Sequence, residues 1–216
     1  MTKAVIFDFD GLLVNTEIIS FYIYRDMLKK FGFSYSKEEY ARNYSGKTGV
    51  ANMRRLIDTY HLPYSPEEGL AVERKLEEEY LAKGVELKKG AHELLEYLKD
   101  NSYKIAVASS STAQRAMNIL KAHQIDHYFD AFVFAEDISR SKPDPEIFLK
   151  AAGRLNTDVS ECLVLEDSEA GIEAASQGNI PVICIPDMKM PSEQQILKTA
   201  AVLRSLDEVI EWMNKI

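Results

Sequence analysis

The sequence predicts an α/β fold, in which a Rossmann-like parallel sheet carries an inserted, all-helical domain. Short apolar runs alternate with amphipathic segments of helical length, which is typical of a parallel sheet covered by helices on both faces. Five of these runs have the length and composition of buried strands, and only one of them precedes residue 100. More than ninety residues separate the first run from the second, whereas a simple crossover needs a single helix. The pattern therefore predicts a domain inserted after the first strand.

The predicted strands are the apolar runs at 4–9, 104–108, 131–135, 162–165 and 181–185. The four that follow residue 100 alternate with helical segments, which predicts parallel neighbours in one sheet. Near the end of the chain, the segment 205–208 has a serine followed three residues later by a glutamate. This is the pattern of a capping box, and it predicts the start of a last helix that covers the core.

The inserted segment has the boundary signals of helices. Capping boxes occur at 36–39 and 65–68, and the second has a proline at the first helical position. We expect a helical cap domain at 15–88 and an α/β core formed by 1–14 and 89–216. Because the insert follows the carboxyl end of the first strand, it is placed to cover whatever site lies there.

Composition and charge narrow the class of protein. With 46% hydrophobic and 28% charged residues, the 216-residue chain has the make-up of a water-soluble globular protein. Its 26 basic and 34 acidic side chains give a net charge of −8, and without a basic run nucleic acid is not an expected partner.

The first apolar run is interrupted by Asp8 and Asp10, so neither a membrane span nor a signal peptide is expected. Cys162 and Cys184 fall in predicted buried strands, which favours a reducing, cytoplasmic location.

The first strand ends in an Asp-x-Asp pair. Asp8 and Asp10 flank Phe9, and the two-residue period of a strand places both carboxylates on one side while Phe9 faces the other. Gly11 then lets the chain turn. Two aspartates at the end of a strand are more often turn formers than catalytic groups when they stand alone.

Further polar residues follow the other strands. Ser109 comes directly after the second strand, Lys142 lies in the loop after the third, and Glu166 and Asp167 follow the fourth. Open parallel sheets bind ligands outside the carboxyl ends of their strands. If the strands are neighbours, these side chains converge with the aspartate pair in one crevice.

The residue types at this edge indicate a phosphate site that holds a metal ion. Three or four crowded carboxylates repel one another and need a cation, and an all-oxygen set of donors suits Mg²⁺. A lysine, a hydroxyl and helix N-termini expected near Ser111 and Ser168 suit an anion instead. A carboxylate beside Mg²⁺ and lysine can attack phosphorus to form an aspartyl phosphate, while a second carboxylate two residues on gives a proton to the leaving oxygen.

Four motifs of the chain resemble, in order and spacing, the signature motifs of the haloacid dehalogenase-like hydrolase superfamily. They are Asp8-Phe9-Asp10-Gly11, Ser109 after its strand, Lys142 before Pro143, and Glu166-Asp167-Ser168 followed by Gly171. The resemblance covers nearly the whole chain, and the helical insert is similar to the small α-helical cap of that superfamily. The β-phosphoglucomutase-like phosphatases are the subfamily that the chain resembles most.

This resemblance implies a role for each motif residue. Asp8 would be the nucleophile, Asp10 the general acid and base, and Ser109 and Lys142 ligands of the transferred phosphate. The implied Mg²⁺ ligands are Asp8, the carbonyl of Asp10, Glu166 and Asp167. The implied activity is a Mg²⁺-dependent phosphatase that acts on a small phosphorylated metabolite through an aspartyl phosphate.

Single residues separate the branches of the superfamily. True dehalogenases lack the second aspartate of the first motif, which is present here as Asp10. β-Phosphoglucomutases have a histidine about ten residues after that aspartate and an arginine in the cap loop, where this chain has Ser20 and Gly49. A phosphatase is therefore favoured and a phosphomutase is the alternative, with Lys47 or Arg54 as partial substitutes for the arginine. A phosphorylation-switched signalling module is less favoured, because an insert over the site suits turnover.

Three residues near the predicted site have two readings each. Ser110 and Ser111 either contact phosphate or substrate, or cap a helix. Lys47 either contacts the substrate from the cap or is simply solvated. The sequence does not choose between a sugar phosphate, a nucleotide and a phosphoglycolate-like acid, and it predicts no oligomeric state.

Overall fold

The computed structural model describes residues 2–215 and divides into two compact units. We call Met1–Asn15 with Leu87–Ile216 the core unit, and Thr16–Glu86 the helical unit. The borders expected from the sequence, after 14 and after 88, lie within two residues of these borders.

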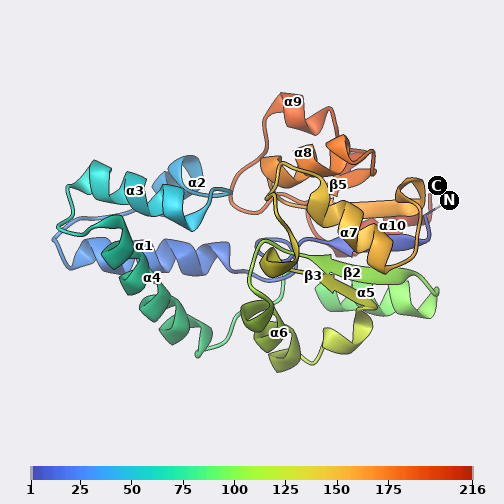
Figure 1. Ribbon diagram of the computed structural model, residues 1–216, viewed down its shortest axis with the longest axis horizontal. Helices are drawn as coiled ribbons and strands as arrows, with labels where there is room; N and C mark the ends of the chain where they lie inside the picture. Colours follow the sequence, from blue (N-terminus) through green and yellow to red (C-terminus); the bar gives the residue numbers. More distant parts are fainter. Residues whose placement is uncertain (1, 216) are drawn as a thin grey trace. The chain divides into compact units, whose positions relative to one another are not determined.

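In the described part of the chain, the core unit is built on a six-stranded parallel sheet with the order β3-β2-β1-β4-β5-β6 (Figure 1). The strands are β1 (Ala4–Phe7), β2 (Lys104–Ala108), β3 (Ala131–Val133), β4 (Cys162–Glu166), β5 (Val182–Cys184) and β6 (Ala201–Val202). The predicted α/β fold is confirmed, and each of the five predicted strands is present. The sequence does not predict β6, because two residues at the edge of a sheet form no apolar run.

The order of the strands reverses at β1. Ala4 of β1 is in register with Lys104 of β2 on one side and with Cys162 of β4 on the other. The chain therefore starts in the middle of the sheet, builds outward to β3, and then returns to build outward through β4 to β6. Such a reversal leaves a crevice at the carboxyl ends of the central strands, because the connections lead away in opposite directions.

Helices cover both faces of the sheet. They are α5 (Ala91–Asp100), α6 (Ala113–Ala122), α7 (Glu146–Arg154), α8 (Glu169–Gln177), α9 (Glu193–Ile196) and α10 (Asp207–Met213), with short 3-10 turns η1 (Asp126–Tyr128), η2 (Ala135–Asp137) and η3 (Val159–Glu161). Ala4 and Ile6 pack with the apolar side chains of α7 and α8 on one face. Val5 and Phe7 are equally buried and point to the other face. On that face α5 contacts β2 and α10.

The helical unit consists of α1 (Glu17–Lys29), α2 (Lys37–Asn43), α3 (Gly49–Tyr60) and α4 (Pro66–Leu81). The capping box predicted at 65–68 is confirmed, because the hydroxyl of Ser65 accepts from the backbone of Glu68 and the carboxylate of Glu68 accepts in return. At 36–39 the hydroxyl of Ser36 caps α2 in the same way. The carboxylate of Glu39 does not complete the capping box, because it accepts a hydrogen bond from the hydroxyl of Tyr60.

Aromatic side chains fill the interior of the helical unit. Tyr24, Tyr40 and Tyr44 are fully buried and contact one another through their rings. The hydroxyl of Tyr24 donates to the carboxylate of Glu73 at 3.0 Å. Burial raises the pKa of Glu73 to about 7, although the hydrogen bond from Tyr24 opposes the shift.

The capping box predicted at 205–208 is wrong. Helix α10 begins at Asp207 and has no side-chain cap. The carboxylate of Glu208 accepts from the backbone N–H and the guanidinium of Arg204, at 3.0 and 2.7 Å. In a capping box the carboxylate of Glu208 would accept from the backbone N–H of Ser205. Here Arg204 occupies that carboxylate instead.

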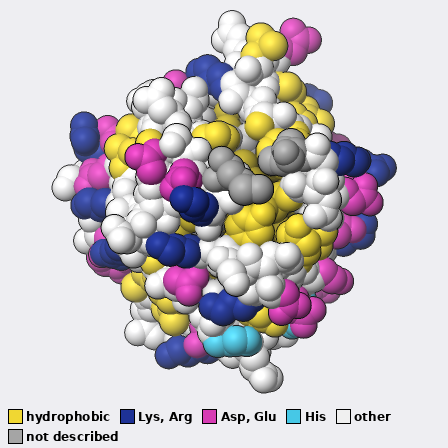
Figure 2. Space-filling view, turned by 90° about the vertical axis from the view of Figure 1, so that its right-hand side faces the viewer, with side chains coloured by type: hydrophobic (Ala, Val, Ile, Leu, Met, Phe, Trp, Pro, Cys, Tyr) yellow, Lys and Arg dark blue, Asp and Glu magenta, His cyan; other side chains and the backbone are white. Residues whose placement is uncertain are grey.

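The side of the core unit shown in Figure 2 carries charges of both signs. Figure 2 shows lysine, arginine, aspartate and glutamate side chains interspersed over that face, with hydrophobic side chains between them. Lys3 and Glu161 form an ion pair at 2.6 Å near the start of β1. None of the helices within residues 2–215 is long and apolar enough to span a membrane.

We expect opposite effects from alanine at two glycines of the core unit. Gly90 caps α5 with φ +82°, and a Cβ there would lie 2.1 Å from the backbone nitrogen of Asp207. Gly90→Ala should lower the free energy of unfolding by about 2 kcal/mol or more. Gly153 lies inside α7 with open space around it, so Gly153→Ala should raise that free energy by about 0.5–1 kcal/mol. Urea unfolding of both variants measures the difference, and equal midpoints would contradict the expectation.

Candidate active site

Polar side chains meet at the carboxyl ends of the three central strands. Asp8 follows β1, Ser109 follows β2, and Glu166 is the last residue of β4, with Asp167 directly after it. The backbone N–H of Asp8 still donates to Leu165 of β4, at 3.0 Å, so the aspartate is held at the end of the ladder. The convergence expected from the sequence is therefore present in the core unit.

Three carboxylates and one ammonium form the centre of this cluster, in which Asp8 and Glu166 are buried and Asp167 is partly exposed. Asp8, Glu166 and Asp167 each offer an oxygen within 4.8 Å of the others. The ammonium of Lys142 lies between two of them, with an ion pair to Asp8 and a second to Glu166 at 2.6 Å. Only 9% of the Lys142 side chain is exposed, and its ammonium lies 4.8 Å from the centre of the Phe148 ring. Lys142 thus neutralises part of the negative charge from within the protein.

The electrostatics of the cluster favour a further cation. Burial raises the pKa of Asp8 to about 7, and the nearby Glu166 adds to the rise while Lys142 opposes it. Burial also disfavours the charged form of Lys142, but the ion pairs with Asp8 and Glu166 outweigh it, so the pKa of Lys142 is raised and the ammonium stays charged. One lysine does not balance three carboxylates. The all-oxygen donor set and the surplus of negative charge fit a divalent cation such as Mg²⁺.

Glu166 is fully buried and both of its oxygens have donors. One accepts from Lys142, and the other accepts from the backbone N–H and the hydroxyl of Ser168, at 2.8 and 2.9 Å. The hydroxyl of Ser168 also caps α8 by accepting from Gly171. Glu166 therefore holds the lysine in place as well as adding charge to the cluster.

Two glycines give the carboxylates room. A Cβ at Gly171 would lie 1.7 Å from an oxygen of Glu166, and a Cβ at Gly11 would lie 2.5 Å from an oxygen of Asp167. Gly11 also has φ +82°, a conformation that L side chains rarely adopt. Both glycines belong to the motifs quoted above, and the structure gives the steric reason for them.

Asp10 lies in a second group of contacts at the start of α6. Its two carboxylate oxygens accept from the hydroxyl of Ser111 at 2.5 Å and from the guanidinium of Arg115 at 2.7 Å. Arg115 also donates to the hydroxyl of Ser111 at 2.7 Å. Ser109 is buried behind them, and its hydroxyl accepts from the backbone N–H of Ser111 at 3.0 Å. Ser111 thus links two of the motifs.

Arg115 is not among the site residues expected from the sequence. A signal for it exists, because Arg115 follows Ser111 by four residues and the two therefore share one face of the chain around the first turn of α6.

A second unpredicted residue, Asp187, follows β5 and pairs with Lys88 at 2.5 Å. Its other oxygen would lie 3.5 Å from a Cβ at Gly11. The rule that ligands bind beyond strand ends would have pointed to Asp187.

The remaining predicted residues are outside the buried cluster. Ser110 is exposed beside Ser109. Lys47 belongs to the helical unit, where its ammonium donates to the carbonyl of Asn43 at 2.8 Å. A contact of either residue with a substrate stays a prediction.

Comparison with known proteins defines the class of this enzyme. The family model of haloacid dehalogenase-like hydrolases matches residues 5–185. The chain belongs to this family and is an enzyme of the hydrolase class.

Individual relatives include phosphatases. A phosphorylated carbohydrates phosphatase of Thermotoga maritima is 31% identical over 218 residues, which cover 99% of this chain and 99% of that protein. A Drosophila melanogaster protein named "Probable pseudouridine-5'-phosphatase" is 32% identical over 209 residues, covering 93% of this chain and 88% of that protein. The crystal structure of a β-phosphoglucomutase from Clostridium difficile has the same fold, with a TM-score of 0.77, 24% identity and coverage of 100% of this chain and 96% of that one.

We expect Gly171→Ala to weaken metal binding at the cluster. The added methyl group would displace the side chain of Glu166, and with it the ammonium of Lys142. Mg²⁺ affinity, measured by titration calorimetry, should fall at least about tenfold, on the scale of changes to residues that orient metal ligands. Gly153→Ala, a glycine-to-alanine change with open space around it, should keep the affinity of the unmodified protein. Equal affinities in the two variants would contradict this expectation.

Proposed function

We propose that this enzyme is a Mg²⁺-dependent phosphatase that hydrolyses a small phosphorylated metabolite through an aspartyl phosphate formed on Asp8. The proposal rests on the buried ion pair of Lys142 with Asp8 and Glu166, next to Asp167. A carboxylate that is buried, close to an ammonium and at the open edge of a sheet has the position of a nucleophile for a phosphate group. The phosphatases among its relatives agree with this chemistry.

The first half of the reaction transfers the phosphoryl group to the protein. An oxygen of Asp8 attacks phosphorus, and the bond from phosphorus to the ester oxygen breaks. Asp10, protonated, gives its proton to that ester oxygen, so the product leaves as a neutral alcohol. The ammonium of Lys142 and the hydroxyl of Ser109 stabilise the negative charge on the phosphoryl oxygens.

The second half releases phosphate. A water molecule gives its proton to the carboxylate of Asp10 and attacks phosphorus, and the bond from phosphorus to Asp8 breaks. Asp8 and Asp10 then have the protonation states with which they started. A Mg²⁺ ion held by Asp8, the carbonyl of Asp10, Asp167 and Glu166 would neutralise charge on the phosphate and on Asp8.

The helical unit is a candidate cap over this chemistry. It is inserted directly after the loop that follows Asp8 and Asp10, and excluding bulk water from an aspartyl phosphate limits side reactions. We assign the choice of substrate to this unit, with Lys47 as a contact to the substrate and Ser110 and Ser111 as contacts from the core.

Two buried free thiols, Cys162 and Cys184, agree with a cytoplasmic location.

Water is the favoured acceptor of the phosphoryl group, which makes the enzyme a phosphatase. A phosphomutase is the alternative. A mutase must hold a second phosphate group, for which a bidentate arginine is well suited. This chain has Gly49 where β-phosphoglucomutases have that arginine, and Ser20 where they have a histidine. A sugar phosphate is the favoured substrate class, since a relative matched over 99% of its length is a phosphorylated carbohydrates phosphatase.

Phosphate release from a panel of phosphorylated metabolites should require Mg²⁺ and Asp8. We expect Asp8→Asn to lower kcat at least about 1,000-fold, because the amide is not a nucleophile toward phosphorus. The panel is assayed with Mg²⁺ and with EDTA, and includes β-glucose 1-phosphate. Release that continues in EDTA or in Asp8→Asn rules the proposal out. Glucose 6-phosphate without free phosphate would identify a mutase, and a phosphoprotein that persists for hours would favour a signalling module.

Arg115 should act by orienting Asp10, and the identity of the leaving group tests this. If Asp10 protonates the leaving oxygen, Arg115→Ala should lower kcat/KM for an alkyl phosphate at least tenfold more than for p-nitrophenyl phosphate, whose leaving group needs no proton. Equal losses would instead assign Arg115 to binding the phosphate itself. Gln114→Ala, on the same helix and paired with Asn118 at 3.0 Å, is the matched control and should change neither value.

A further inference from the structure

Lys142 is held at the cluster by a loop that has no regular secondary structure. The loop lies between η2, which ends at Asp137, and α7, which begins at Glu146. Such a segment does not fix the position of an ammonium by backbone ladders of its own. Its geometry therefore depends on contacts made by the residues at its two ends.

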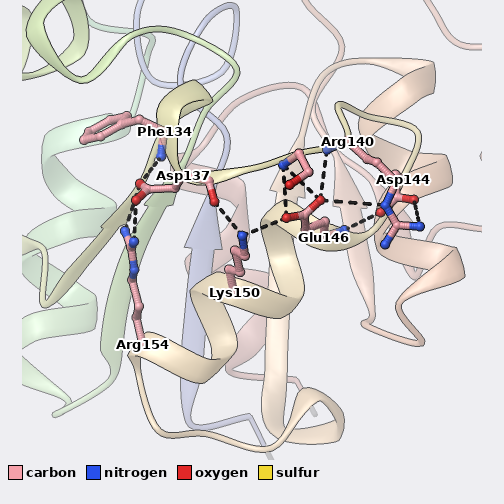
Figure 3. A network of polar contacts seen from close by, with 8 residues as sticks. Phe134, Asp137, Arg140, Asp144, Glu146, Lys150 and Arg154 are labelled. Carbon is pink, nitrogen blue, oxygen red and sulfur yellow. Dashed lines mark hydrogen bonds and ion pairs between the residues drawn. The ribbon is translucent and has the colours of Figure 1, made fainter.

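Glu146 supplies the main contacts to the first part of this loop. Its carboxylate accepts from the backbone N–H of Ser139 at 3.1 Å and from the backbone N–H of Arg140 at 2.9 Å (Figure 3). Only 13% of the Glu146 side chain is exposed. A carboxylate that accepts from two backbone N–H groups fixes those peptide groups in direction as well as in distance.

Lys150 ties the same carboxylate to the beginning of the loop. Its ammonium lies 2.7 Å from Glu146 and donates to the carbonyl of Asp137 at 2.5 Å. In Figure 3 the side chain of Lys150 stands between these two groups, one helical turn below Glu146. The hydrogen bond from Lys150, together with those from Ser139 and Arg140, lowers the pKa of Glu146 to about 2. These contacts therefore favour the ionised form of Glu146.

The second part of the loop has its own anchors. Asp144 accepts from the backbone N–H of Glu146 at 2.9 Å and pairs with the guanidinium of Arg140 at 3.0 Å. The backbone N–H of Asp144 donates to the carbonyl of Ser141 at 3.1 Å. The residues around Lys142 thus form a network in which Arg140 contacts the carboxylate of Glu146 directly and Asp144 contacts it through Arg140.

We propose that Glu146 is a positioning residue for Lys142, and that it holds the loop so that the ammonium reaches Asp8 and Glu166. The consequence for turnover rests on the proposed function of Lys142, whereas the effect on the loop does not. The carboxylate of Glu146 is occupied by the backbone of the loop and by Lys150, so we assign it no part in the chemistry itself. It acts only through the residue that it places.

Limited proteolysis tests the effect on the loop without any assay of activity. Trypsin cleaves after Arg140, whose side chain is 71% exposed, while the bond after Lys142 is protected by Pro143. We expect Glu146→Ala and Glu146→Gln to raise the rate of cleavage after Arg140 at least tenfold at a temperature where both are folded. Glu173→Ala is the matched control, because Glu173 also accepts from a lysine and two amides but lies on α8. An unchanged rate at Arg140, or an equal rise in the control, overturns the proposal.

A double-mutant cycle tests the action through Lys142. Glu146→Ala should lower kcat/KM for phosphate release about 10- to 100-fold in the otherwise unmodified enzyme, and less than twofold in a Lys142→Ala background. A loss that is equally large in both backgrounds means that Glu146 acts by another route and overturns the proposal. If the unmodified enzyme releases no phosphate from any substrate, the proposed function fails, while the proteolysis result still decides the role of Glu146.

Discussion

The candidate site depends on placing several carboxylates at one edge of a sheet without driving them apart. Asp8, Glu166 and Asp167 come from two neighbouring strands, and their oxygens lie within 4.8 Å of one another. Like charges at such distances are costly when water is excluded, unless a positive group is placed among them. Lys142 is that group, and it is nearly as buried as its partners. The loop of Lys142, the cap of α8 and the glycines beside Glu166 and Asp167 all serve to keep this arrangement.

The carboxylates of the site have different hydrogen-bond partners, and these partners indicate a different role for each. Both oxygens of Glu166 accept hydrogen bonds, one from Lys142 and the other from Ser168, so its carboxylate is fixed in place beside the cluster. Asp8 lies at the carboxyl end of β1, and its pKa is raised by burial while Lys142 opposes the rise; carboxyls perturbed by burial and by a charged partner are typical of functional sites. Asp10 has different partners, Ser111 and Arg115. Two aspartates separated by one residue therefore have separate electrostatic environments, as expected of a nucleophile and an acid or base.

Much of the fold and the centre of the site could be predicted from the sequence, because both depend on local patterns. Buried parallel strands are short apolar runs, and the polar residue that ends each run falls at the edge where ligands bind. Contacts between distant segments have no such pattern. Arg115 and Glu146 are ordinary helical residues in the sequence, and only the packed structure shows that they reach Asp10 and the Lys142 loop. The misplaced capping box at 205–208 has a local origin instead, since Arg204, four residues before Glu208, competes for its carboxylate.

The connection between the two units has a consequence for how such proteins diversify. Val14 and Leu87 form an antiparallel bridge, and the backbone N–H of Lys88 donates to the carbonyl of Leu13 at 2.9 Å. The two ends of the insertion are thus held side by side within the core unit, whatever lies between them. The entropy of closing a loop grows only slowly with its length once its ends are fixed together. Evolution can accordingly lengthen, shorten or exchange the segment 16–86 as a module without rebuilding the sheet edge of the core unit.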